Sequence, residues 1–246
     1  MNDTILSFFL TIIAGFSTMI GTIIIFIKNI NHNRIIAYSL SFASGVMLTI
    51  SLTDLIPESI KLINTNNYFI TIFISLIFVF IGIYISLFID KITTKNNNNL
   101  LYKTGILSMI AIIIHNIPEG IITFITADNN IKLGINLTIA IALHNIPEGI
   151  SIAVPIYYST NNKIKAIKYT LISAISEPLG AIITFLFLKK FINNFILGIL
   201  FSCIAGIMLE ISIFNLLPTS KKYQYNNSKN IFFILGILIM LIKFII

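Results

Sequence analysis

The sequence contains a single cysteine, Cys203, which excludes a disulfide within the chain and a cluster of thiolate metal ligands. Charged residues are also scarce, at 10% of 246 residues, whereas a soluble domain of this size carries about 25%. No polar stretch is long enough to form a separate soluble domain. The scarcity of charge therefore favours one membrane-embedded domain that covers residues 1–246.

Long apolar segments fill most of the sequence, which is 57% hydrophobic with a mean hydropathy of +0.96. Apolar runs of about 18 residues or more can cross a bilayer. Continuous Ile, Leu and Phe runs favour spanning α-helices over the alternating pattern of a β-barrel. The first run has no positive flank and no cleavage signal, which indicates a retained helix. We predict an all-α, polytopic fold with eight spans, at 5–27, 35–56, 69–89, 104–127, 133–157, 167–188, 195–217 and 231–246.

The formal net charge of +7 would suit a nucleic-acid partner, but the positions of the cations favour a different interpretation. Most cations lie in the short connections after the odd-numbered spans, and few lie after the even-numbered ones. The positive-inside rule then places the odd loops in the cytoplasm and both termini outside it. The cations of the odd loops are Lys28, Arg34, Lys91, Lys95, Lys103, Lys163, Lys165, Lys168, Lys221, Lys222 and Lys229, and those of the even loops are Lys61, Lys132, Lys189 and Lys190. Lys243 lies inside the last span, and the polar loop at 90–103 reads as a flexible surface segment.

Two segments of the chain repeat each other at a distance. Residues 45–59 read GVMLTISLTDLIPES and residues 206–220 read GIMLEISIFNLLPTS, with the same residue at most positions. The copies lie on spans two and seven, which run in opposite directions in the predicted topology. Such inverted repeats are common in transporters. We therefore expect spans 1–3 and 6–8 to form an inverted repeat around a central pair, spans 4 and 5.

A shorter repeat, His-Asn-Ile-Pro-Glu-Gly, occurs at 115–120 in span four and again at 144–149 in span five. Residues three or four apart share one face of a helix, so each copy presents an imidazole, an amide and a carboxylate together. Imidazole with carboxylate suits Zn²⁺, Fe²⁺ and Mn²⁺. Two such faces would hold one or two ions. The candidate ligands are His115, Asn116, Glu119, His144, Asn145 and Glu148.

Carboxylates inside the spans also favour a bound cation. An unpaired charge at the centre of a bilayer costs at least about 2.5–3.5 kcal/mol. Glu177, beside Pro178 in span six, supplies a further candidate ligand. Pro118 and Pro147 each remove an amide donor inside a span, which lipid tolerates only where the backbone is buried or lines a cavity. The roles of Asp54 and Glu210 stay open from the sequence.

Two other functions would use buried ionisable residues. An intramembrane metalloenzyme would want a His-Glu-x-x-His pair with the glutamate as base, and neither copy has that order. A proton-coupled carrier of monovalent cations could use the acids as a relay, but it leaves the paired His and Asn without a role. We therefore expect a transporter of divalent metals with no catalytic cofactor, not an enzyme.

The two motifs and the Gly-Val-Met-Leu and Leu-Leu-Pro segments resemble the ZIP (Zrt/Irt-like) family of divalent metal transporters, and within it the bacterial zinc transporters. The resemblance covers essentially the whole chain and is strongest over 110–181. It implies eight helices with both termini outside the cytoplasm, in a multi-pass protein of the bacterial cytoplasmic (inner) membrane. It also implies that the six motif residues are ligands of a binuclear-type site, which Glu177 completes.

The same resemblance implies uptake of Zn²⁺ into the cytoplasm, with Fe²⁺, Mn²⁺, Co²⁺ and Cd²⁺ as other substrates. It implies movement of one helix group against the other, and assembly as a homodimer. The sequence departs from the family pattern in two places. The loop between spans three and four has no histidine, so metal capture there is not expected. Asn215 stands where many relatives have an acid, while Glu210 lies five residues earlier.

Overall fold

The computed structural model describes residues 3–27, 31–94, 99–188, 191, 193–223 and 228–241. The described residues are almost entirely helical and include no strand. Seven helical segments are long and apolar enough to cross a membrane, and a shorter apolar helix lies near the C-terminal end of the described chain. The fold class predicted from hydropathy, an all-α polytopic membrane protein, is therefore confirmed. The elements are α1 (Asp3–Ser17), η1 (Thr18–Phe26), α2 (His32–Ile50), η2 (Ser51–Leu55), α3 (Ile56–Ile63), α4 (Tyr68–Thr94), α5 (Leu100–Asn129), α6 (Ile131–Thr160), α7 (Lys163–Ile183), η3 (Thr184–Leu188), α8 (Asn194–Glu210), η4 (Ile211–Leu216), α9 (Leu217–Lys222) and α10 (Ser228–Leu241).

The second and seventh spans are longer than predicted, and both contain the same irregularity. Each helix widens into a short π-helical segment, η2 or η4, and then continues as α3 or α9. Pro57 and Pro218 each follow the π-helical segment by two residues, and the residues before them still make i→i+5 hydrogen bonds, from Ile56 N–H to the carbonyl of Ser51 and from Leu217 N–H to that of Ser212. The proline therefore does not end the span, and the helical path runs over His32–Ile63 and Asn194–Lys222.

The polar loop predicted at 90–103 as a flexible segment is instead helical at both ends, over 90–94 and 100–103. α4 continues to Thr94, and α5 begins at Leu100. The side chain of Asn99 accepts hydrogen bonds from the backbone N–H groups of Leu101 and Tyr102, which fixes the start of α5. Several predicted features lie outside the described residues, namely 95–98, the end of the last span at 242–246, and the cations Lys28, Lys95, Lys189, Lys190 and Lys243.

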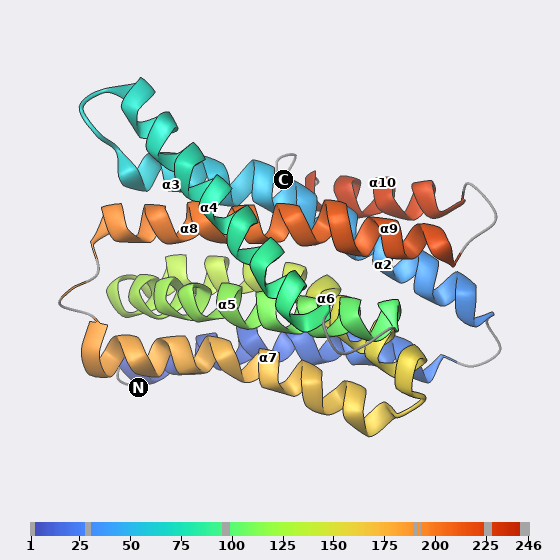
Figure 1. Cartoon of the computed structure of the whole chain (residues 1–246). Coiled ribbons are helices and arrows are strands. Elements are labelled where there is room, and N and C mark those ends of the chain that lie inside the picture. The colour runs from blue at the N-terminus through green and yellow to red at the C-terminus, as the bar shows by residue number, and fades with distance from the viewer. Residues whose placement is uncertain are drawn as a thin grey trace.

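The helices form two groups, which Figure 1 shows as two layers. One layer contains α1, α5, α6 and α7, and the other contains α2, α8 and α10, with α4 crossing the face of the bundle obliquely. α2 packs against α10, while α8 packs against α4. α2 of the first repeat thus packs against the last helix of the second repeat, and α8 of the second repeat packs against the last helix of the first. α2 and α8 run in opposite directions, as an inverted repeat requires.

Hydroxyl groups join the two helical segments that carry the repeat copies. The Ser44 hydroxyl donates to the carbonyl oxygen of Ser212 at 3.0 Å, and the Ser212 hydroxyl donates to that of Ser44 at 2.8 Å. Ser41 and Ser220 are also hydrogen-bonded, at 3.0 Å. Polar bonds of this kind hold helices together where lipid supplies no hydrophobic drive. Buried hydrogen bonds between hydroxyl and carbonyl groups therefore join α2 to the α8–η4–α9 segment.

Candidate metal centre

The central pair, α5 and α6, carries the two copies of the His-Asn-Ile-Pro-Glu-Gly motif. The helices lie side by side and antiparallel, joined by the short turn at Asn130 (Figure 1). Gly120 and Gly149 are the last residues of the two motifs, and each lies at a tight helix crossing. A Cβ added at Gly120 would overlap the carbonyl oxygen of Glu177, and one added at Gly149 would overlap that of Thr18. α7 therefore lies against the first motif, and η1 lies against the second. The glycines bring four helices close enough for their polar side chains to meet.

Three motif side chains converge between α5 and α6. Glu119 Oε1 lies 2.9 Å from His144 Nε2 and 3.0 Å from His115 Nε2. The contact with His144 has hydrogen-bond geometry, whereas Nε2 of His115 is close enough for an ion pair but has no aligned hydrogen bond. One ligand atom from each residue lies within 4.8 Å of the others, and all three residues are buried. At this spacing the three side chains could hold a metal ion.

Glu148 joins the same cluster from α6. Its Oε1 lies 3.4 Å from His115 Nε2, and the side chain is fully buried. Neither carboxylate oxygen of Glu148 has a hydrogen-bond partner in the protein. The chain of contacts therefore runs from Glu148 through His115 and Glu119 to His144, as the facing motifs predicted.

The two asparagines bind neighbouring helices through their amide nitrogens. Asn145 Nδ2 donates to Glu177 Oε2 at 3.0 Å and to the carbonyl oxygen of Ala14 at 2.9 Å. Asn116 Nδ2 donates to the carbonyl oxygen of Ser173, one turn before Glu177 on α7, at 3.3 Å. Both amide nitrogens are therefore occupied, whereas both amide oxygens are buried and have no hydrogen-bond partner in the protein. The bond to Ala14 brings α1 into the site, which nothing in the sequence pattern predicted.

Buried side-chain atoms without a hydrogen-bond partner are concentrated in this centre. Buried polar groups in proteins are usually paired, and leaving one unpaired costs about 1–3 kcal/mol. Six of the seven predicted ligand residues nevertheless have such an atom. The atoms are His115 Nδ1 and Nε2, Asn116 Oδ1, Glu119 Oε2, Asn145 Oδ1, Glu148 Oε1 and Oε2, and Glu177 Oε1. Imidazole nitrogen, carboxylate oxygen and amide oxygen are all donors to divalent metals, so these groups could hold a cation.

Comparison with known proteins places this arrangement in a family. The sequence model described as "ZIP Zinc transporter" matches residues 97–243, more than half of the chain. A protein of Clostridium perfringens with the name "Zinc transporter ZupT" is 36% identical, over 99% of this chain and 96% of its own length. Proteins of the same name from Lysinibacillus sphaericus and Campylobacter jejuni are 39% and 38% identical, over 91% and 94% of this chain and 90% and 92% of theirs.

The chain belongs to the ZIP zinc transporter family. Members of the ZIP family are transporters, so neither an intramembrane metalloenzyme nor a carrier of monovalent cations is supported. The sequence-based recognition of the family is confirmed.

Asn215, which departs from the expected ZIP pattern, binds the carboxylate of Glu210. Its Nδ2 donates to both oxygens of Glu210, at 3.1 and 3.2 Å, and Ser86 of α4 donates to the same carboxylate. A π-helical segment brings residues five apart onto the same line, and η4 starts directly after Glu210. The acid Glu210 therefore lies about one π turn before Asn215, and its carboxylate is hydrogen-bonded by Asn215 of η4 and by Ser86 of α4. Neither Glu210 nor Asp54 is in the His115–Glu119–His144 cluster.

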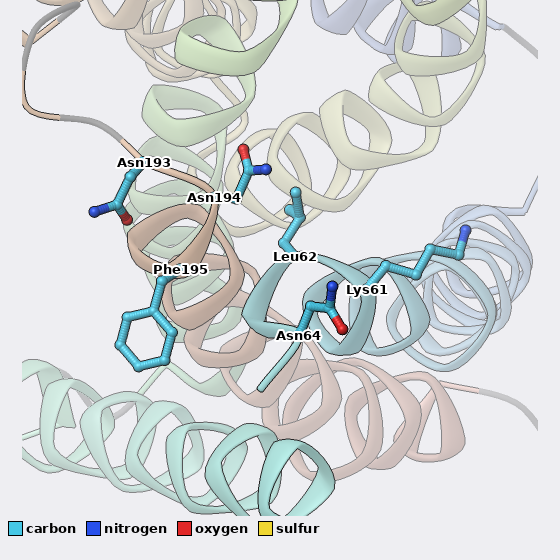
Figure 2. Close-up of a pocket in the computed structure, with 6 residues that line it drawn as sticks. All are labelled: Lys61, Leu62, Asn64, Asn193, Asn194 and Phe195. Carbon is cyan, nitrogen blue, oxygen red and sulfur yellow. The ribbon is translucent and has the colours of Figure 1, made fainter. Parts of the chain in front are cut away.

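A surface pocket lies elsewhere in this ZIP-family fold, between the end of α3 and the start of α8 (Figure 2). Its volume is about 560 Å³, and its lining residues are Lys61, Leu62, Asn64, Asn193, Asn194 and Phe195. No lining residue belongs to α5, α6 or α7. The pocket is thus separate from the metal centre.

Proposed function

We propose that the whole chain acts as one transporter domain that carries Zn²⁺ across the cytoplasmic membrane into the cytoplasm, using the centre between α5, α6 and α7. Membership of the ZIP family and the names of its relatives as zinc transporters support zinc as the cargo. The observation that carries the assignment is the set of buried, unpartnered donor atoms of six predicted ligands. Fe²⁺, Mn²⁺, Co²⁺ and Cd²⁺ are further candidate substrates, because nitrogen and oxygen donors also bind them.

The centre offers two adjacent sets of ligands. His115, Glu119, His144 and Glu148 form the first set, within contact distance of one another. Asn116, Asn145 and Glu177 form the second, because Asn145 already bonds Glu177. Glu119 and Glu148 each have two oxygens and can bridge the sets. This arrangement supports one or two bound ions, with the carboxylates in their charged form.

We further propose the orientation with both termini outside the cytoplasm. The C-terminal ends of η1, α4, α6 and α9 lie at one end of the bundle, and those of α3, α5 and η3 lie at the other (Figure 1). Most Lys and Arg residues of the loops belong to the first end. The positive-inside rule assigns that end to the cytoplasm of a bacterial inner membrane. Alternating access would then come from movement of one helix group against the other, in a homodimer.

Metal uptake by reconstituted protein tests the proposed function. Purified wild-type protein in liposomes is expected to take up Zn²⁺, and Glu119→Ala and Glu148→Ala are each expected to reduce the initial rate to background. Glu58→Ala is the matched control, because Glu58 is an exposed acid that pairs with Lys61 outside the centre. Uptake that persists in both site variants would refute the assigned site. A wild-type protein that takes up no divalent metal would refute the transport function.

A further inference from the structure

Buried hydroxyl groups in this protein usually donate to a backbone carbonyl of their own helix. Thr104, Thr170 and Thr184, for example, each donate to the carbonyl four residues earlier. Among the described residues, four buried hydroxyls lack any hydrogen-bond partner in the protein, namely Thr18, Ser108, Thr123 and Thr138. All four lie on η1, α5 and α6, the elements that surround the metal centre. An unpaired buried hydroxyl is unfavourable, so its location is a candidate for a site that another molecule or ion completes.

Two of these hydroxyls belong to residues at one level of the central helix pair. An added Cβ at Gly134 of α6 would fall on Ala127 of α5, so these two residues mark one level of the antiparallel pair. Thr123 lies four residues from Ala127, and Thr138 lies four residues from Gly134. Equal steps along antiparallel helices keep residues at one level, about one turn from the close approach. Thr123 and Thr138 therefore lie at about the same level of the α5–α6 pair.

The same threonines lie about one helical turn from the metal centre, on the side of the α5–α6 turn. Glu119 is four residues from Thr123 and shares its face of α5, as residues one turn apart do. Glu119 in turn contacts His144 of α6, because its Oε1 lies 2.9 Å from His144 Nε2. Both threonines are almost completely buried, at 0% and 3% exposure. The pair thus lies between the tight Ala127–Gly134 approach and the Glu119–His144 contact.

We propose that Thr123 and Thr138 form a transit site for the divalent cation, on the side of the α5–α6 turn. This proposal rests on the proposed transport function. Their hydroxyl oxygens would bind the hydrated ion, directly or through its water, as it passes between that end of the protein and the ligands of the centre. Hydroxyl and water oxygens suit a cation that is only partly dehydrated.

The test replaces each threonine with valine, which has the same shape but no hydroxyl. We expect Thr123→Val and Thr138→Val each to lower the initial rate of Zn²⁺ uptake into liposomes about tenfold, as for loss of one bond to a charged group. Thr123→Ser should retain most of the rate. Equilibrium binding of Zn²⁺ to purified protein should change less than about twofold, because the ligands of the centre are intact. Thr184→Val is the matched control, since that buried hydroxyl bonds the carbonyl of Gly180, and its uptake rate should be unchanged.

A purely structural role predicts a different result. Removing an unpaired buried hydroxyl should leave thermal stability unchanged or raise it, with no effect on uptake. Valine variants that transport as fast as Thr184→Val would therefore overturn the transit site, while the proposed function would stand on the wild-type rate. Loss of equilibrium Zn²⁺ binding in parallel with rate would also overturn it, because the threonines would then support the centre itself. Absence of uptake by wild-type protein would instead refute the transport function.

Discussion

Lys103 of α5 forms an ion pair with Asp90 of α4, with Nζ 2.7 Å from Oδ1. The next residue, Thr104, is hydrogen-bonded to Thr219 of α9 at 2.9 Å. Both bonds join the helix group that carries the candidate ligands to the group that contains α2, α4 and α8. They lie at the end of α5 that we assign to the cytoplasm. The two bonds can therefore act as a latch that holds that end closed.

Weakening this latch should expose the inner half of α5. A partly exposed ion pair contributes up to about 1 kcal/mol, which corresponds to about a fivefold change in an opening equilibrium. We expect Lys103→Gln to raise the rate at which a hydrophilic maleimide labels Ser108→Cys, in a Cys203→Ser background, by about two- to fivefold. Lys61→Gln is the control, because Lys61 pairs with Glu58 within one group. Equal labelling rates for Lys103→Gln and the parent would contradict the latch.

The bond between Asn215 and Glu210 should matter for stability rather than for metal coordination. Glu210 is buried, and Asn215→Leu would remove the amide that donates to both of its oxygens. We expect a loss of about 1–3 kcal/mol in the free energy of unfolding, measured by denaturation in detergent. Asn194→Ala, at an exposed position of α8, should stay within about 0.5 kcal/mol of wild type. An Asn215→Leu protein as stable as this control would show that Glu210 does not depend on the amide.

The motif glycines should tolerate no added methyl group. A Cβ at residue 120 would overlap the carbonyl oxygen of Glu177, and one at residue 149 would overlap that of Thr18. Backbone atoms cannot rotate away, so Gly120→Ala and Gly149→Ala should each destabilise the protein by about 1–3 kcal/mol and lower zinc uptake. Gly105→Ala is the comparison, because its nearest neighbour is the end of the Ile156 side chain, which can adjust. A thermal shift assay that ranks Gly105→Ala as the most damaging of the three would contradict this.

Asn116 and Asn145 should each contribute to zinc affinity. Their nitrogens bond the protein, and their buried oxygens have no partner. We expect Asn116→Ala and Asn145→Ala to weaken equilibrium Zn²⁺ binding about tenfold or more, as loss of a ligand or its support does. Asn145→Ala should have the larger effect, because it also releases Glu177. Calorimetric titration measures the affinities, with the exposed Asn136→Ala of α6 as the control. Wild-type affinity in both site variants would exclude the amides as ligands.

Hydropathy and spacing predicted the helices and the facing motifs because both depend on local composition. Continuous apolar runs require helices in lipid, and a His–Glu pair four residues apart must share a face. The bond from Asn145 to Ala14 was not predictable in this way, since its acceptor is a backbone carbonyl that every residue possesses. The pairing of Glu210 with Asn215 depends on a π turn, whereas the sequence argument assumed regular α-helical spacing. Pro155, a second proline inside α6, also carried no signal of its own.

All seven candidate ligands belong to α5, α6 and α7, and the hydrogen bonds of Asn116 and Asn145 tie these helices to one another and to α1. A bound ion would therefore move together with this one group of helices. If the group shifts against α2, α4 and α8, the ion moves by the same distance while its coordination bonds stay intact. The step that carries the ion from one side of the membrane to the other could then take place with the same ligands of the centre holding it throughout.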